Sequence, residues 1–226
     1  MAMKLEQVVP FGRSLDEYKK MFNLSATDLT QRILGVGDGP ASFNAEVTTM
    51  GGHVTSIDPI YQFQGPEILQ QFHAVVDDII AQVKASPEDW VWSYHASPEA
   101  LRQSRIQTIQ TFIADYDRGQ QAGRYQVAAL PELPFPDQSF DLALCSHFLF
   151  LYSDHYDAAF HLDSVQAMLR VSREVRIFPL VTLMMQRSPH LEFVLRALEE
   201  RGYSVTTVKV AYELQKGGNE MLVIQS

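Results

Sequence analysis

The segment Gln31-Arg-Ile-Leu-Gly-Val-Gly-Asp-Gly-Pro-Ala-Ser-Phe43 decides the fold, together with Val54-Thr-Ser-Ile-Asp58 a little further along the chain. Ile33, Leu34 and Val36 form a short apolar run that is typical of a buried parallel strand. Glycines follow at positions 35, 37 and 39. Because glycine has no Cβ and tolerates positive φ, a ligand can lie against the bare backbone of such a turn.

A helix and a second strand are predicted after the glycine turn. Pro40 suits the first turn of a helix, and Phe43, Val47 and Met50 have the spacing of its inner face. The pair Gly51-Gly52 ends this helix, and His53–Ile57 forms the next strand. Asp58 then stands at the carboxyl end of the second strand, where an acid can hydrogen-bond both hydroxyls of an adenosine ribose.

Two classes of adenosine ligand use this arrangement. Dinucleotides require the spacing Gly-x-Gly-x-x-Gly, with a pyrophosphate at the helix N-terminus. The sixth position is Pro40 when counted from Gly35 and Ser42 when counted from Gly37, so the spacing fails in both registers. A tight turn that binds no ligand remains open as the plain structural alternative.

The segment resembles the first motif of class I S-adenosylmethionine (SAM)-dependent methyltransferases, whose ligand carries no phosphate. Leu34, Gly37 and Gly39 match that motif, whereas Gly35 stands in place of the usual acid and Ala41 in place of a third glycine. In the family the acid helps to hold the ammonium group of SAM. Asp38 is the nearest possible substitute for it.

A second match lies about a hundred residues further on, in the order that the family requires. Leu133-Pro134-Phe135 and Phe140-Asp141 resemble the family's Leu-Pro-Phe and the Phe-Asp that opens the fourth strand. The family often has an aspartate at the exit of the third strand, where this chain has Ala129. The resemblance then implies that backbone groups near Leu130 hold the adenine.

The resemblance covers about residues 30–226, with the insertion at 62–122 excepted, and implies a single α/β domain with a Rossmann-like seven-stranded sheet. The implied strand order is 3-2-1-4-5-7-6, with strand 7 antiparallel and helices on both faces. Residues 1–30 form a helical leader, capped at Ser14, with a further short helix from Ser25 or Thr27. Residues 62–122 form a helical insertion between strands 2 and 3. The remaining elements are predicted as strands over 125–130, 142–145, 173–180, 203–210 and 221–224, and as helices over 157–171 and from Ser188-Pro189 to Gly202, with a hairpin-type turn at 216–219.

Three groups of site residues follow from the resemblance and from the position of polar side chains at strand ends. His147, just beyond the fourth strand, is a candidate general base because its reference pKa lies near neutrality; packing beneath the next helix is the structural alternative. His155 and His161 are predicted to be exposed or capping. The candidate SAM-binding residues are Gly35, Gly37, Asp38, Gly39, Asp58, Pro59, Ala129, Leu130 and Ser146, with Ile60 or Tyr61 against the adenine. The candidate acceptor-binding residues are Arg13, Tyr18, His147 and Phe148.

The insertion contains an aromatic segment, Asp89-Trp-Val-Trp-Ser-Tyr-His95. Its aromatic side chains could line an acceptor pocket or a dimer contact, or they could seal two amphipathic helices onto the sheet. The leader offers a similar choice for Arg13, which is either a residue of the acceptor site or a surface charge.

Composition limits the classes of function. Hydrophobic residues make up 46% of the 226 residues, which suffices for a full core. No apolar run reaches the ~18 residues of a membrane helix, and Met1–Gln7 lacks the features of a signal peptide. Only one cysteine is present, Cys145, so a disulfide framework and a cysteine zinc cluster are excluded and a cytoplasmic location is expected. The formal net charge of −9 disfavours a nucleic-acid partner, and no metal-ligand spacing stands out.

The sequence therefore predicts a SAM-dependent methyltransferase that acts on a small molecule, with no membrane partner and a possible homodimer. Two alternatives remain open. One is a SAM-binding protein without transferase activity, which the altered first motif suggests. The other is a nicotinamide-dependent oxidoreductase.

Overall fold

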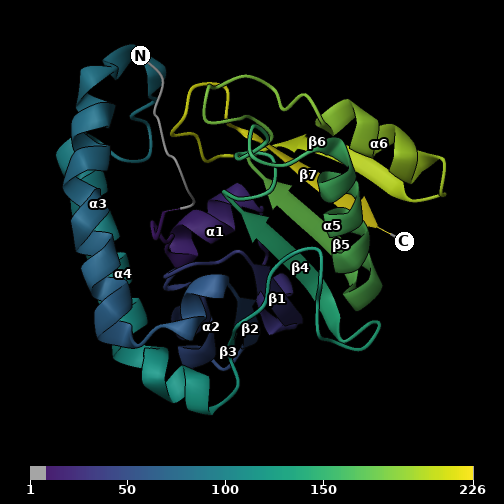
Figure 1. Ribbon diagram of the computed structural model, residues 1–226, viewed down its shortest axis with the longest axis horizontal. Helices are drawn as coiled ribbons and strands as arrows, with labels where there is room; N and C mark the ends of the chain where they lie inside the picture. The colour runs from purple at the N-terminus through teal and green to yellow at the C-terminus, as the bar shows by residue number, and fades with distance from the viewer. Residues whose placement is uncertain (1–8, 226) are drawn as a thin grey trace.

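A seven-stranded sheet runs through the centre of the computed structural model, which describes residues 9–225 (Figure 1). The strand order is β3-β2-β1-β4-β5-β7-β6. Strand β7 is antiparallel to β5 and β6, and the other pairs are parallel. The predicted order is confirmed. The strands are β1 (Arg32–Val36), β2 (His53–Ile57), β3 (Tyr125–Gln126), β4 (Phe140–Ser146), β5 (Ser172–Phe178), β6 (Ser204–Lys209) and β7 (Glu220–Gln225).

Helices cover both faces of the sheet because alternate strand residues point to opposite sides. Ile33 and Leu144 belong to one core cluster, whereas Leu34 and Cys145 belong to the other. The first face carries α1 (Leu15–Met21), α2 (Phe43–Thr49), α3 (Gly65–Ala85) and α4 (Pro98–Gln121); the second carries α5 (Ala158–Val171) and α6 (Leu191–Glu199). Short 3-10 turns occur at η1 (Asp28–Thr30), η2 (Pro59–Gln62) and η3 (Pro87–Asp89).

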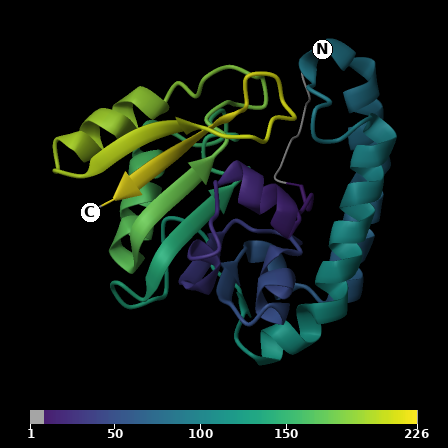
Figure 2. The same cartoon turned by 180° about the vertical axis from the view of Figure 1, so that it is seen from behind.

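The leader helix and the helical insertion pack against each other. Both views show α1 between the sheet and the long pair α3 and α4 (Figures 1 and 2). The predicted helical insertion is confirmed, as is the cap at Ser14, whose side chain accepts from the Glu17 amide in a capping box. The short helix predicted after Ser25 is only the turn η1. The signal-peptide expectation for Met1–Gln7 lies outside the described residues.

The helix after the glycine turn is shorter than predicted at both ends. It begins at Phe43 rather than Pro40, because the Ser42 amide donates to the backbone oxygen of Arg13 (3.1 Å) and keeps the preceding residues in a loop. Met50 was predicted on the inner face but is 63% exposed. It is the C-cap residue, where the chain has already left the helical path.

Further along the chain, three other predictions are corrected. Strand β3 ends at Gln126 rather than at Leu130, since the chain then leaves the sheet and Ala129 pairs with Glu132 in an isolated bridge. His161 is fully buried, not exposed, because its ring bonds the backbone oxygens of Asp157 (2.7 Å) and Leu149 (2.9 Å). Helix α6 starts at Leu191, and the Ser188 hydroxyl accepts from the His190 amide instead of capping the helix directly.

The connection between β6 and β7 is a long loop over residues 210–219 instead of the tight turn that was predicted. Tyr212 and Leu214 in this loop are buried against the leader and the insertion. The amide of Val91 donates to the oxygen of Leu214 (2.8 Å), which ties the loop to the insertion. This loop, which we call the late loop, therefore lies close to the leader and the insertion.

Candidate functional site

The glycine turn is bent by two residues with positive φ. Gly37 has φ 64° and Gly39 has φ 54°, a region that favours glycine. The Gly37 amide donates to the oxygen of Ile57 (2.9 Å), and the hydroxyl of Tyr61 donates to the oxygen of Gly39 (2.7 Å). Tyr61, one of the two residues predicted to lie against the adenine, thus bonds the backbone of the turn. Ile60, the other one, lines the cavity beside the turn.

Asp58 lies at the mouth of this turn. Its carboxylate accepts from the amide of Gly39 (2.9 Å) and from that of Ile60 (2.8 Å). Burial raises the pKa of Asp58, while these two hydrogen bonds act in the opposite direction. The side chain is only partly buried and lines the cavities on both sides of the turn.

The larger of these two cavities has a volume of about 380 Å³ and lies on the β2 and β3 side of the turn. We call it the nucleoside cavity. Six of the predicted SAM-binding residues line it: Gly37, Gly39, Asp58, Pro59, Ala129 and Leu130. Phe148, a predicted acceptor residue, lines this cavity too, beside Gly37, whereas Arg13, Tyr18 and His147 line a different one.

The second cavity has a volume of about 100 Å³ and extends from the turn towards the insertion. We call it the inner cavity. At the turn it is lined by the polar residues Arg13, Tyr18, Asp38, Ser146 and His147. At the far end it is lined by apolar side chains of the insertion and the late loop: Ile79, Val83, Trp90, Leu101 and Leu214. The two cavities share Gly37, Gly39 and Asp58, so they are neighbouring compartments over one turn.

Asp38 occupies the space that a side chain at position 35 would need. A Cβ built on Gly35 would lie 1.9 Å from Oδ2 of Asp38. That carboxylate accepts from the hydroxyls of Tyr18 and Ser56, both at 2.6 Å. Burial raises the pKa of Asp38 to about 6, in spite of those two hydrogen bonds. Gly35 itself lines neither cavity, and the lack of a side chain at this position leaves room for Asp38.

A substitution at Gly35 tests this steric relation. We expect Gly35→Ala to lower the free energy of unfolding by about 1–3 kcal/mol, since the added methyl must displace a buried carboxylate. Gly65→Ala is the matched control, because a Cβ there meets only ordinary contacts at 3.6 Å or more. Urea unfolding of both variants measures the difference. A Gly35→Ala protein as stable as the wild type would show that Asp38 does not fill this space.

His147 lies at the carboxyl end of β4, in the inner cavity. Its amide donates to the oxygen of Phe178 (2.7 Å), its φ is 52°, and its Nδ1 lies 3.0 Å from the hydroxyl of Ser146. Burial and the charges of Arg13 and Arg105 hold its pKa well below the usual 6.5. The ring is therefore neutral at neutral pH, and in the tautomer that donates from Nδ1 to the Ser146 hydroxyl the lone pair of Nε2 can accept a proton.

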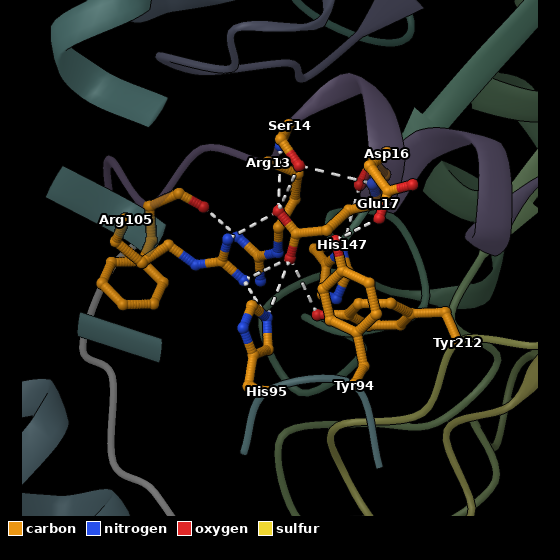
Figure 3. A network of polar contacts seen from close by, with 11 residues as sticks. Arg13, Ser14, Asp16, Glu17, Tyr94, His95, Arg105, His147 and Tyr212 are labelled. Atoms are coloured by element: carbon orange, nitrogen blue, oxygen red, sulfur yellow. Dashed lines mark hydrogen bonds and ion pairs between the residues drawn. The ribbon is translucent and has the colours of Figure 1, made fainter. Parts of the chain in front are cut away.

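Sequence reasoning missed a buried network beside this cavity, which Figure 3 shows converging on the carboxylate of Glu17. Arg105 donates to both oxygens of Glu17 (2.7 and 2.6 Å). The hydroxyl of Tyr212 (3.0 Å) and the ring of His95 (3.2 Å) bond the same carboxylate. A signal did exist: Arg105 falls on the apolar face of its helix, four residues from both Leu101 and Ile109.

The aromatic segment of the insertion divides between two roles. Trp90 lines the inner cavity, in keeping with the alternative that aromatic side chains of this segment line a pocket. Tyr94 donates to Asp16 of the leader (2.7 Å), and His95 contacts Glu17. These side chains therefore bind the insertion to the leader helix rather than sealing it onto the sheet.

Comparison with known proteins agrees with this geometry. A family model described as a methyltransferase domain matches residues 91–173, which include the Leu133-Pro-Phe and Phe140-Asp segments but not the glycine turn. The uncharacterized protein MJ0045 of Methanocaldococcus jannaschii is 32% identical over 224 residues, covering 99% of this chain and 98% of that protein. The chain belongs to the same family as that protein, and it has the fold of class I SAM-dependent methyltransferases, with a methyltransferase-domain match over residues 91–173.

Solved structures are similar at the level of fold. The methyltransferase domain of bacterial CtHen1-CN has a TM-score of 0.50 and 12% identity, over 94% of this chain and all of that domain. Mitomycin 7-O-methyltransferase MmcR has a TM-score of 0.47 and 14% identity, over 93% of this chain and 53% of its own length. Among residues 9–225, no helix is long and apolar enough to cross a membrane. Over the same range no group of three or more His, Cys, Asp or Glu side chains could hold a metal ion.

Proposed function

We propose that this methyltransferase transfers the methyl group of SAM to a small-molecule acceptor, with the nucleoside of SAM in the nucleoside cavity and the acceptor in the inner cavity. The observation that carries the proposal is the position of Asp58. Its carboxylate bonds the Gly39 amide at 2.9 Å, so an acid and a bare glycine turn face the same opening. The formal net charge of −9 supports a small molecule over a nucleic acid as the acceptor.

The residues present suit the parts of SAM. Asp58 would accept from the ribose hydroxyls, and the backbone at Leu130 would bond the adenine between Ile60 and Phe148. The methionine part would lie along Gly37 and Gly39, where no Cβ projects. Asp38 lines the inner cavity beside the turn and would hold the ammonium group in place of the acid missing at position 35.

SAM supplies a methyl group that is already activated by its sulfonium, so the protein's contribution is to position and desolvate the reactants. The neutral ring of His147 would take the proton of an oxygen or nitrogen nucleophile bound in the inner cavity. Ser146, hydrogen-bonded to Nδ1 of that ring, would hold the orientation of the imidazole. The insertion closes the cavity with apolar side chains and so excludes water from the reacting atoms.

Calorimetric titration with S-adenosylhomocysteine (SAH), SAM and NAD tests the proposal. We expect SAM and SAH to bind and NAD to show no binding. NAD binding in preference to SAH would favour the oxidoreductase alternative and contradict the proposal. Methyl-labelled SAM incubated with a small-molecule extract separates transferase from simple binding protein, since only a transferase moves the label to another compound.

The affinity for SAM should depend on pH through Asp38. Its pKa of about 6 means that the carboxylate becomes protonated as the pH falls below that value, and a neutral carboxyl no longer attracts the ammonium group. We expect SAM affinity to fall by roughly tenfold between pH 7.5 and pH 5. The Asp38→Asn variant should bind weakly at both values and lose most of this dependence. A wild-type affinity that is constant over this range would contradict the assignment of Asp38.

A further inference from the structure

One largely buried guanidinium beside the inner cavity, that of Arg13, forms no ion pair within residues 9–225. The side chain of Arg13 lines that cavity, and its Nη1 donates to the backbone oxygen of Phe11. Its Nε is buried without a hydrogen-bond partner, and Arg13 makes no ion pair with any residue from 9 to 225. Burying a cation without a counter-ion is costly, so such a residue indicates an anionic ligand.

The neighbouring Arg105 shows what a neutralised guanidinium looks like at this place. It binds both oxygens of Glu17, and both side chains are fully buried. Glu17 also receives hydrogen bonds from Ser14 and Tyr212, so its carboxylate is fully engaged. Arg13 lies over the same Phe11 ring as Arg105, with centroid distances of 5.7 and 5.2 Å. Burial and the charge of Arg105 lower the pKa of Arg13 in spite of the opposing charge of Glu17, so an added anion would relieve the remaining repulsion.

The two carboxylates that line the same cavity are engaged elsewhere. Asp38 accepts from Tyr18 and Ser56, and Asp58 accepts from the backbone of the turn. Neither is paired with Arg13. The positive charge of Arg13 is therefore available to a bound molecule.

The wall opposite the turn is apolar and comes from the insertion. Ile79, Val83 and Leu101 line it from α3 and α4, and Trp90 follows η3. The cavity of about 100 Å³ is smaller than the apolar cavity of roughly 150 Å³ that binds benzene, so it takes at most a single ring or a short branched chain. A molecule that fills this space would present its apolar part to the insertion and its charged group to Arg13.

We propose that the methyl acceptor is a small organic acid, whose ring or branched apolar part lies against Ile79, Val83 and Trp90 and whose carboxylate is held by Arg13. This inference rests on the proposed function and adds the chemical class of the acceptor. It also gives the insertion a role, because the insertion supplies the apolar wall. SAM carries a carboxylate of its own, so the experiment must separate the two sources of the anion.

Benzoate and its neutral isostere benzamide serve as probes, titrated into SAH-saturated protein and followed by ligand NMR. We expect wild-type protein to bind benzoate about tenfold more tightly than benzamide, as a charge-assisted hydrogen bond predicts. Arg13→Gln should abolish this preference and Arg13→Lys should keep part of it. Arg173→Gln is the matched control, since it removes one charge from an exposed side chain on β5 and should change nothing.

SAH titration of the same variants distinguishes the two anions and confirms folding. The proposal predicts that Arg13→Gln changes SAH affinity by less than about threefold. A tenfold loss of SAH affinity would mean that Arg13 holds the carboxylate of the methyl donor, and would overturn the proposal. Equal binding of benzoate and benzamide by the wild type would overturn it as well. Failure of the wild type to bind SAH would refute the proposed function instead, and the probe comparison could still be made without SAH.

Discussion

Replacing Asp58 by alanine is expected to reduce SAH affinity at least about a hundredfold. The carboxylate would supply charge-assisted hydrogen bonds to the ribose, each contributing roughly 1.5–3 kcal/mol, and its loss also releases the amides of Gly39 and Ile60. The variant would therefore lose the contact with the ribose and also two hydrogen bonds that shape the glycine turn. Calorimetric titration of SAH into the variant measures the effect.

Two further variants keep this result interpretable. Asp137→Ala removes an exposed acid that is far from the turn in the sequence and should bind SAH like the wild type. Asp58→Asn keeps the size of the side chain but loses its charge and the acceptor for one of the two amides, so we expect intermediate affinity and a smaller loss of stability than in Asp58→Ala. Retention of wild-type SAH affinity by Asp58→Ala would refute the ribose assignment.

The largest effect on stability is expected at Glu17. Removing one partner of a buried ion pair leaves the other charge uncompensated, at a cost of about 3–5 kcal/mol. Glu17→Ala would strand Arg105 and also release Ser14, His95 and Tyr212. We therefore expect a marked fall in the urea midpoint of unfolding. Glu99→Ala is the matched control, because its ion pair with Lys84 is solvent-exposed and should contribute little.

The same ion pair predicts the direction of acid unfolding. Burial alone would raise the pKa of Glu17, but the charge of Arg105 and the hydrogen bonds of His95 and Arg105 outweigh it and hold the pKa well below 4.5. A carboxyl with a depressed pKa stabilises the fold above its unfolded pKa and loses that contribution as the pH falls towards its folded pKa. Wild-type stability should therefore drop below about pH 4.5, and the Glu17→Ala curve should be flatter there. Parallel curves for the two proteins would contradict this account of Glu17.

The order of the sheet could be predicted because its signals are local. The apolar run at Ile33–Val36, the glycines after it and the alternation of the later strands each occupy a few consecutive residues. The fold of the family then determines how such elements are arranged. Element ends were less predictable. Met50 has the spacing of an inner residue, yet it is the C-cap of a helix that ends at Thr49. The start of the same helix is shifted to Phe43 by the hydrogen bond from the Ser42 amide to the leader.

The residues of the candidate site were likewise predicted only where their sequence signals are local. The glycine turn and Asp58 were predicted from their spacing in the sequence. The structure brings the Asp58 carboxylate within hydrogen-bond distance of the Gly39 amide. The network around Glu17 was not predicted, because its partners are far apart in the sequence: Arg105 is 88 residues away and Tyr212 is 195. The late loop was predicted to be a tight turn, so nothing in the sequence pattern pointed Tyr212 towards the leader. Gly35 was predicted to contact the cofactor, whereas only the packing of Asp38 reveals its steric role.

A crystal structure of the protein with SAH tests the central claim most directly. Our account predicts that both ribose hydroxyls lie within hydrogen-bond distance of the Asp58 carboxylate, with the adenine between Ile60 and Phe148 and the homocysteine along the turn at Gly37–Gly39. A nucleoside bound elsewhere on the chain, with the opening between Asp58 and Gly39 empty, would contradict it.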